Sequence, residues 1–247
     1  MIIWLASYPK SGNTWIRSLL CSYLFSKNKF SLLDLKKIPR FSLSDFIQNK
    51  NLLKTNLNVA EQWINVQTYI NKKIKKTVFF KTHNAALSVN KNLFTDSNNT
   101  AGCIYVVRDP RNIITSYKNF ESMSYEGALK HMTNSDAFLF DKKKFENKFG
   151  FRGYEPIMSW SENYKSWAHN KLGIPVHLIR YEDMIKDTLE ELKKVINFIA
   201  EIQKDKNFKF DDEKGKKAVD QSSFQSLSEL ESINGFSEAR EGRKFFH

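Results

Sequence analysis

The chain alternates between short apolar runs and longer segments in which apolar side chains recur at helical spacing. The apolar runs are rich in β-branched and aromatic residues, as buried strands are, and they span residues 2–6, 77–83, 101–107 and 176–181. Helical spacing is found at residues 15–25, 112–120, 160–170 and 187–202. Because strands and helices alternate, we predict an α/β fold with a parallel sheet that is flanked by helices on both faces.

Two long stretches do not follow this alternation. Residues 31–76 are polar and rich in Lys and Asn, with amphipathic pieces at 43–47 and 59–74, and we expect helices there that flank the functional site. Residues 121–163 are irregular, charged and aromatic. In an α/β domain a long irregular insertion of this kind is typical of a binding lid.

A turn-rich segment joins the first apolar run to the first helical one, and it reads Ser7-Tyr8-Pro9-Lys10-Ser11-Gly12-Asn13-Thr14-Trp15. The free N–H groups and the dipole at a helix start favour a bound phosphate, to which Lys10 adds a mobile positive charge. The hydroxyl groups of Ser11 and Thr14 are further donors. We therefore predict an anion-binding loop in a P-loop-like fold. An ordinary strand–helix turn with a surface lysine is the simpler alternative.

The order of residues in this loop differs from that of the ATPases. In a Walker A loop the lysine directly follows the second glycine, whereas Lys10 precedes Gly12 by two residues. The pattern thus indicates a phosphate loop of another kind.

Length and composition favour one domain, residues 1–247, because a chain of 247 residues with 41% hydrophobic residues fills a single sizeable core. Cys21 and Cys103 are isolated within apolar segments, so we expect buried free thiols and a reducing compartment. No apolar run is long enough for a membrane span. We therefore predict a cytoplasmic protein with no membrane partner.

The net charge of +12 favours anionic ligands of any kind. The lysines cluster in runs that are typical of solvated faces, at 72–76, 142–144 and 214–217. Since none of these runs interleaves with aromatic residues as in RNA-binding modules, we expect no nucleic-acid partner.

Polar residues follow the other three strands: Lys81-Thr82-His83, Arg108 to Ser116, and Tyr181-Glu182-Asp183. The carboxyl ends of parallel strands meet at one edge of a sheet, so these segments and the loop around Lys10 should form a single site. A lone histidine at a strand end is more often structural. Its coincidence with two lysines favours His83 as a base that takes a proton from an alcohol.

Three of these segments resemble motifs of the sulfotransferases that use 3'-phosphoadenosine 5'-phosphosulfate (PAPS). Tyr8 to Trp15 resembles their 5'-phosphosulfate loop, and Lys81-Thr82-His83 is similar to their Lys-Thr-His segment, whose histidine is the general base. Arg108 and Ser116, eight residues apart, resemble their 3'-phosphate motif. The alternative for Arg108 is an ion pair with Asp109 or Glu182 at the sheet edge. The resemblance implies that residues of the loop bind the donor, namely Lys10, Ser11, Gly12, Asn13, Thr14 and Trp15.

Shorter matches extend the resemblance towards the adenosine. Tyr181 lies in a Tyr-Glu-Asp-Met segment, and Ser222-Ser223-Phe224 is similar to an adenine-side Thr-Ser-Phe segment, which assigns Tyr181, Ser222 and Phe224 to the cofactor site. Trp15 is implied to stack on the adenine, although it fits a core position equally well. The family's Arg-Lys-Gly run is not clearly present. Arg240-Glu241-Gly242 is a partial match, and residues 244–247 are an alternative start of that segment.

We therefore expect a sulfuryl group to move from PAPS to a hydroxyl, or less favourably an amine, of a small-molecule or glycan acceptor, leaving 3'-phosphoadenosine 5'-phosphate (PAP). The resemblance implies that His83 is the base, that Lys10 offsets charge on the leaving phosphate oxygen and that Lys81 assists at the sulfonate, with no metal. The alternatives are a Mg-ATP kinase in which Asp109 binds Mg²⁺, a basic nucleic-acid-binding protein, and a family member that binds PAP without turnover.

Overall fold

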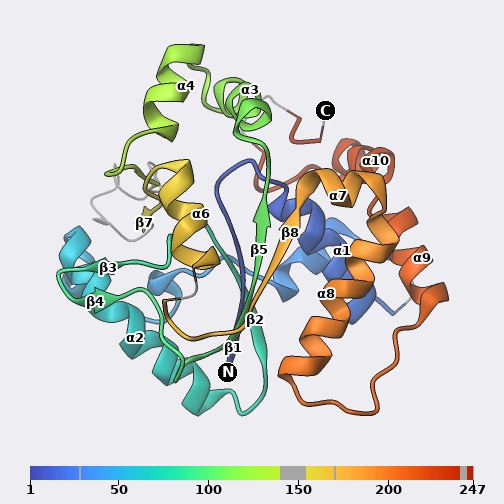
Figure 1. Ribbon diagram of the computed structural model, residues 1–247, viewed down its shortest axis with the longest axis horizontal. Coiled ribbons are helices and arrows are strands. Elements are labelled where there is room, and N and C mark those ends of the chain that lie inside the picture. Colours follow the sequence, from blue (N-terminus) through green and yellow to red (C-terminus); the bar gives the residue numbers. More distant parts are fainter. Residues whose placement is uncertain (28, 140–153, 170, 240–243, 247) are drawn as a thin grey trace.

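The computed structural model describes residues 1–27, 29–139, 154–169, 171–239 and 244–246. Its main sheet has four parallel strands in the order β2-β1-β5-β8. These strands are β1 (Ile2–Ser7), β2 (Val78–Thr82), β5 (Thr100–Val107) and β8 (Val176–Arg180). They coincide with the four apolar runs of the sequence, so the predicted parallel sheet is confirmed (Figure 1).

Helices cover both faces of this sheet (Figure 1). On one face lie α1 (Asn13–Phe25), α8 (Thr188–Ile202), α9 (Asp212–Gln221) and α10 (Phe224–Asn234). On the other face lie α2 (Asn56–Lys73) and α6 (Trp160–Ala168).

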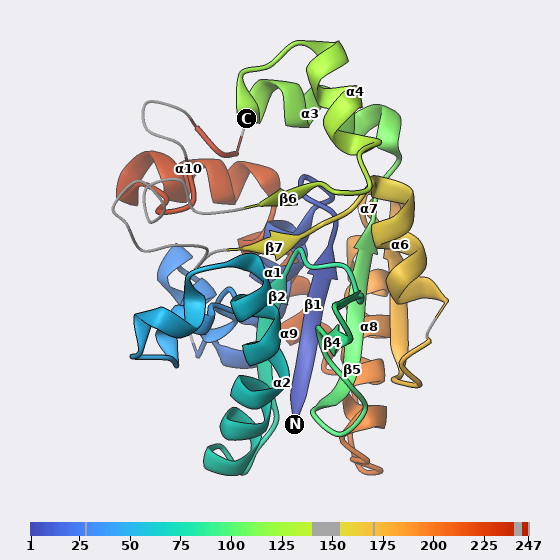
Figure 2. The ribbon, with the colours of Figure 1, turned by 90° about the vertical axis from the view of Figure 1, so that its left-hand side faces the viewer.

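The central strand β1 explains why both faces are covered. Its residues alternate in direction, so that Ile3 and Leu5 pack in the core beneath α1 and α8, whereas Trp4 packs beneath α2 and α6. All six residues of β1 are buried, which is typical of a strand inside a parallel sheet. In Figure 2, β1 stands between α2 on one side and α8 on the other.

The helices after the loop and after the third strand begin close to where the sequence predicted them. The first, α1, begins two residues earlier than expected, at Asn13, directly after Gly12 in a left-handed conformation. After β5, α3 (Pro110–Glu121) starts two residues before the predicted range, on a proline, and the side chain of Asp109 caps it by accepting the N–H of Arg111. Tyr181 was predicted to end a strand, but it begins the short helix α7 (Tyr181–Lys186).

Of the two stretches that do not follow the alternation, the first contains the helix expected at 59–74, which is α2, and the second contains more structure than the pattern indicated. Residues 31–55 form 3-10 turns, η1 (Leu32–Lys37), η2 (Leu43–Asp45) and η3 (Lys50–Leu53). The segment 121–163 contains α4 (Tyr125–Met132), and the strands β6 (Phe138–Leu139) and β7 (Glu155–Pro156) pair with each other. A further short pair, β3 (Ser88–Val89) and β4 (Asn92–Leu93), lies between β2 and β5, where the sequence analysis predicted no strand. Residues 140–153 lie outside the described part, so the lid stays a prediction.

The segment 39–41 continues the sheet beside β2 without being a regular strand. The N–H of Phe41 donates to the carbonyl oxygen of Lys81, and the N–H of Lys81 donates to that of Pro39, each at 2.9 Å. This pairing holds the Arg40 backbone against the end of β2, next to the residues that the sequence assigned to the site.

The C-terminal segment returns to the carboxyl edge of the sheet. The carboxylate of Glu231 in α10 accepts the N–H groups of Phe245 and Phe246 at 2.7 and 2.9 Å. In Figures 1 and 2 this end of the chain lies beside α3, where the Phe245 and Phe120 rings are 6.4 Å apart. Within the parts of the chain described, we find no helix that is both long and apolar enough to cross a membrane.

Candidate functional site at the carboxyl edge of the sheet

The loop between β1 and α1 is shaped by its glycine. Gly12 has φ +99°, and a Cβ atom there would lie 2.5 Å from Cδ2 of Tyr181. Glycine thus lets the loop adopt a left-handed conformation and lets the Tyr181 ring pack directly on it. The preceding Lys10 also has a positive φ, of 66°. The start of α7 therefore covers the loop that starts α1.

Asn13 ties the start of α1 to the end of β1. Its side-chain amide donates to the carbonyl oxygen of Leu5 at 3.1 Å and to the hydroxyl oxygen of Ser7 at 3.2 Å. The loop is thereby held in the shape that leaves the first N–H groups of α1 for a ligand.

Several polar atoms around the loop are buried and lack a hydrogen-bond partner among the described residues: Ser11 Oγ, Asn13 Oδ1, Arg108 Nε and Ser222 Oγ. A buried polar group without a partner costs free energy. All four belong to residues that the sequence assigned to the donor. Their clustering fits a polar, phosphate-bearing ligand at this edge of the sheet.

Lys10 lies between two aromatic rings. Its Nζ atom is 4.2 Å from the centroid of Phe120 in α3 and 4.8 Å from that of Phe245 in the C-terminal segment. Such cation–π contacts stabilise a lysine charge. The predicted loop lysine thus packs against α3 through Phe120 and against the C-terminal segment through Phe245.

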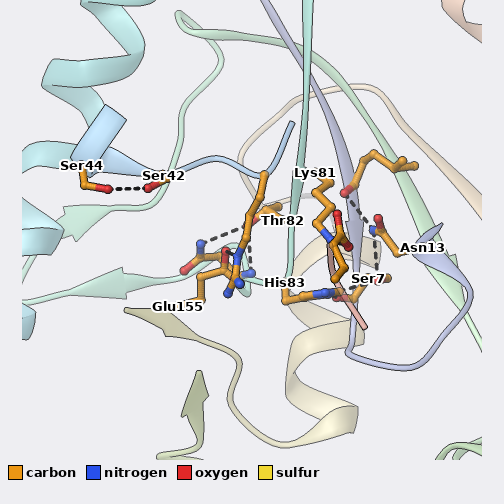
Figure 3. Close-up of polar contacts among 12 residues, drawn as sticks. Ser7, Asn13, Ser42, Ser44, Lys81, Thr82, His83 and Glu155 are labelled. Atoms are coloured by element: carbon orange, nitrogen blue, oxygen red, sulfur yellow. Dashed lines mark hydrogen bonds and ion pairs between the residues drawn. The ribbon is translucent and has the colours of Figure 1, made fainter. Parts of the chain in front are cut away.

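His83 follows β2 and reaches the end of β1. Its Nδ1 atom lies 2.8 Å from the carbonyl oxygen of Ser7 (Figure 3). A carbonyl oxygen only accepts, so Nδ1 carries the proton and Nε2 of the neutral ring keeps its lone pair. Burial lowers the pKa of His83 to about 4; the charge of Glu155 opposes this, and that of Lys81 adds to it. His83 is therefore neutral at physiological pH, as a general base must be.

Lys81 and Arg17 share one carboxylate. Nζ of Lys81 lies 2.6 Å from Oε2 of Glu238, and Nη2 of Arg17 lies 2.6 Å from Oε1 of the same residue. Burial lowers the pKa of Lys81 to about 8, although the Glu238 charge raises it. The sequence identified Lys81 but missed Arg17 and Glu238.

A buried carboxylate lies next to His83. Glu155 in β7 is 2% exposed, and its Oε1 accepts Nε of Arg40 at 2.8 Å. Figure 3 shows Glu155 beside the strand end that carries Lys81 and His83. The sequence gave no signal for this residue, because it falls in an irregular stretch far along the chain from β2.

Arg108 sits over the Tyr181 ring, with its guanidinium carbon 4.1 Å from the ring centroid, and it donates to the carbonyl oxygen of Lys10 at 3.2 Å. It does not pair with Asp109 or Glu182. The carboxylate of Asp109 binds Arg111, and Glu182 accepts the N–H of Asp109 at 2.9 Å. The ion-pair alternative for Arg108 is therefore wrong.

The predicted adenosine residues lie together on the other side of the loop. Nε1 of Trp15 donates to the carbonyl oxygen of Ser222 at 3.0 Å, and its ring packs edge-on against Tyr181 with centroids 5.5 Å apart. Phe224, at the start of α10, is 54% exposed. Ser116 lies on the second turn of α3 and is half-buried. Arg240 falls outside the described residues, so its role stays a prediction.

Comparison with known proteins gives a consistent picture. A family model described as "Sulfotransferase domain" matches residues 2–246. Luciferin sulfotransferase from Photinus pyralis is 26% identical over 232 residues, which are 93% of this chain and 57% of that protein. Sulfotransferase 2A6 from Rattus norvegicus is 25% identical over 79% of this chain and 58% of its own length. This chain thus spans somewhat more than half the length of these relatives.

Solved structures share the fold. A mouse sulfotransferase, SULT7A1, in complex with PAP has a TM-score of 0.57 and 19% identity, and the match covers 92% of this chain and 65% of that one. A retinol dehydratase in complex with retinol and PAP has a TM-score of 0.53 and 15% identity, over 100% of this chain and 73% of that one. The predicted P-loop-like α/β fold is confirmed by these likenesses.

Proposed function

Since this chain belongs to the sulfotransferase domain family, we propose that it transfers a sulfuryl group from PAPS to the hydroxyl of an acceptor. One observation carries this proposal. The imidazole of His83, whose Nδ1 is held by the Ser7 carbonyl, stands beside a buried lysine and an anion-binding loop at one edge of the sheet. This combination supplies a base and positive charge in the same place.

The protein contributes little covalent chemistry to the proposed reaction. PAPS supplies an electrophilic sulfur, whose bond to the 5'-phosphate oxygen breaks as the acceptor oxygen bonds to it. Nε2 of His83 takes the hydroxyl proton as that bond forms. Lys81 stabilises the transferring sulfonate, and Lys10 offsets the charge that grows on the departing phosphate oxygen. Positioning and charge stabilisation therefore dominate, as they do in phosphoryl transfer.

The remaining residues would hold the donor. The helix start at Ser11 to Thr14 suits the 5'-phosphate. The planar guanidinium of Arg108 suits the 3'-phosphate, together with the hydroxyl of Ser116 on the following helix. The adenosine would lie against the group formed by Trp15, Tyr181, Ser222 and Phe224, where ring contacts and the buried Ser222 hydroxyl offer both apolar and polar surface.

We propose a small-molecule alcohol as the acceptor. Among the relatives, the retinol dehydratase was solved with retinol in one structure and with androsterone in another, at TM-scores of 0.53 and 0.50, and each of these small molecules carries a hydroxyl group. A glycan hydroxyl and an amine are the other acceptor classes to compare. For the kinase alternative, Asp109 would have to hold Mg²⁺, yet its carboxylate is engaged by Arg111.

Two measurements test the proposal. Thermal denaturation with PAP or with Mg-ATP separates a sulfotransferase from a kinase, because a ligand at a hundredfold excess over its Kd stabilises the folded state by about 2.7 kcal/mol. PAP should raise the Tm and Mg-ATP should not. Sulfate transfer from PAPS is then measured against a panel of alcohols, sugars and amines. Binding of PAP without any transfer would point to a member that binds the nucleotide only, and a Tm rise with Mg-ATP alone would refute the proposal.

A further inference from the structure

Two buried cations converge on the carboxylate of Glu238. Arg17 comes from α1 and Lys81 from β2, and each binds a different oxygen of Glu238 at 2.6 Å. We infer that Arg17 and Lys81 form a subsite for the sulfonate group of the donor, and that Glu238 fills this subsite until the donor displaces it. The inference rests on the proposed function and adds a second cation and an internal competitor to it.

The burial of the two cations is the first argument for an anion subsite. The side chains of Arg17 and Lys81 are only 3% and 8% exposed, whereas that of Glu238 is 31% exposed. Two positive charges held together out of water repel each other and lose hydration, so an anion must lie between them. Arg17 and Lys81 are thus buried side chains of α1 and β2, whereas the carboxylate of Glu238 lies nearer to solvent.

The second argument is that one carboxylate does not satisfy Arg17. Its Nε and Nη1 atoms are buried and have no hydrogen-bond partner among the described residues. A guanidinium offers five N–H donors, and here each oxygen of the carboxylate already accepts one hydrogen bond, one from Arg17 and the other from Lys81. A sulfonate has three oxygens and so suits this pair of cations better than Glu238 does.

The position of the subsite is the third argument. Lys81 lies two residues before His83, and its charge contributes to the lowered pKa of that histidine. Arg17 lies two residues after Trp15, within the first turns of the helix that begins at the anion-binding loop. An anion between the two cations therefore lies close to β2, which leads to His83, and to the first turns of α1, which follow the loop.

Glu238 and a sulfonate cannot share this place. Two anions beside the same cation repel each other, and Lys81 has one ammonium group to offer. Glu238 belongs to the segment that follows α10. Gly235, with φ +67°, caps the C-terminal end of that helix. The departure of Glu238 moves this C-terminal segment and leaves the sheet and α1 in place. PAP has no sulfonate, so it can bind while Glu238 stays.

The difference between PAPS and PAP gives the test. In Glu238→Gln the competing charge is gone, so the affinity for PAPS should rise about tenfold or more, in the usual range of coupling between sites. The affinity for PAP should change much less. Both Kd values are measured by calorimetry without acceptor. Glu213→Gln is the matched control, because it removes the same charge from a side chain that is 84% exposed and paired with Lys216 on the surface.

A measurement on the wild-type protein keeps the inference testable if Glu238→Gln folds poorly, and a double variant extends the test where it folds. In the wild-type protein, PAPS but not PAP should increase hydrogen exchange at the amides of residues 236–239. Adding Arg17→Gln to Glu238→Gln should remove the gain in PAPS affinity. Equal changes for PAPS and PAP, or weaker PAPS binding in Glu238→Gln, would overturn the inference and make Glu238 a permanent counter-ion. Failure of PAP to bind any variant, the wild type included, would instead overturn the proposed function itself.

Discussion

Nδ1 of His83 donates to the carbonyl oxygen of Ser7 across 2.8 Å. Ser7 is the last residue of β1 and directly precedes the loop that leads into α1, so one backbone position both anchors the loop and orients the imidazole. Because this hydrogen bond fixes the proton on Nδ1, Nε2 is the nitrogen that accepts a proton. The geometry of β1 and β2 therefore determines which nitrogen of His83 is available to the proposed base chemistry.

Replacing His83 should separate transfer from binding. His83→Asn keeps an amide that can donate to the Ser7 carbonyl but removes the basic nitrogen. We expect kcat to fall by about 10²–10⁴-fold, the usual contribution of a general base, while the Kd of PAP changes little. Steady-state kinetics and calorimetry measure the two effects. Turnover within a few-fold of wild type would remove His83 as the base.

The pH dependence of kcat/KM should have two limbs. The pKa of His83 is lowered to about 4, chiefly by burial, so activity should fall only when the pH approaches 4 and the base becomes protonated. The pKa of Lys81 is lowered to about 8, again chiefly by burial, so activity should also fall above pH 8 as its charge is lost.

Lys81→Arg is the control for the alkaline limb, because arginine stays charged throughout this range. The variant should lose the limb near pH 8 and keep the acid limb, whatever its maximal rate. An acid limb near 6.5, the ordinary pKa of histidine, would instead show that His83 is not held in its buried, neutral state in solution.

The fold could be predicted where local pattern decides it. Each strand of the main sheet is a short apolar run, and the loop after β1 has a sequence that only a strand–turn–helix explains. By contrast, α9 and α10 were not predicted, because α9 has very few apolar residues and those of α10 do not define one face: Leu227 is buried, whereas Ile233 is 78% exposed. α9 packs against α1 and α8, whereas α10 packs against η1 and α9, and the local sequence does not reveal these tertiary contacts.

The sequence predicted the site residues that follow strands. It missed residues whose partners lie far away along the chain. His83, Lys81 and Arg108 follow strands, so the rule for parallel sheets located them. Arg17 is a charged residue within an otherwise uncharged helix, which was a usable signal, but its partner Glu238 lies 221 positions along the chain. Arg40 and Glu155 are 115 positions apart. Contacts between such remote residues are set by the three-dimensional fold alone.

The role of Arg108 can be tested with two nucleotides that differ by one phosphate. Arg108→Ala should weaken PAP far more than 5'-AMP, because only PAP carries the 3'-phosphate that the guanidinium would bind. A charge-assisted hydrogen bond contributes about 1.5–3 kcal/mol, which corresponds to a loss of roughly 10–150-fold. Arg111→Ala is the matched control, since Arg111 binds Asp109 and its side chain is 88% exposed. Equal losses for the two nucleotides in Arg108→Ala contradict the assignment.

Gly12 and Gly173 offer a matched pair for the shape of the loop. Both have positive φ, +99° and +64°, so alanine at either position costs backbone strain of about 1–2 kcal/mol. A Cβ atom at Gly12 would lie 2.5 Å from the Tyr181 ring, whereas nothing lies within 4 Å of one at Gly173.

Gly12→Ala should therefore lower the free energy of unfolding by about 1–3 kcal/mol more than Gly173→Ala does, because the ring must move away from the loop. Moving Tyr181 also disturbs Arg108, whose guanidinium carbon lies 4.1 Å from the ring centroid. The Kd of PAP should consequently rise in Gly12→Ala and stay near the wild-type value in Gly173→Ala. Chemical denaturation and calorimetry measure the two quantities. If both variants bind PAP equally well, the Tyr181 ring does not couple the loop to the nucleotide site.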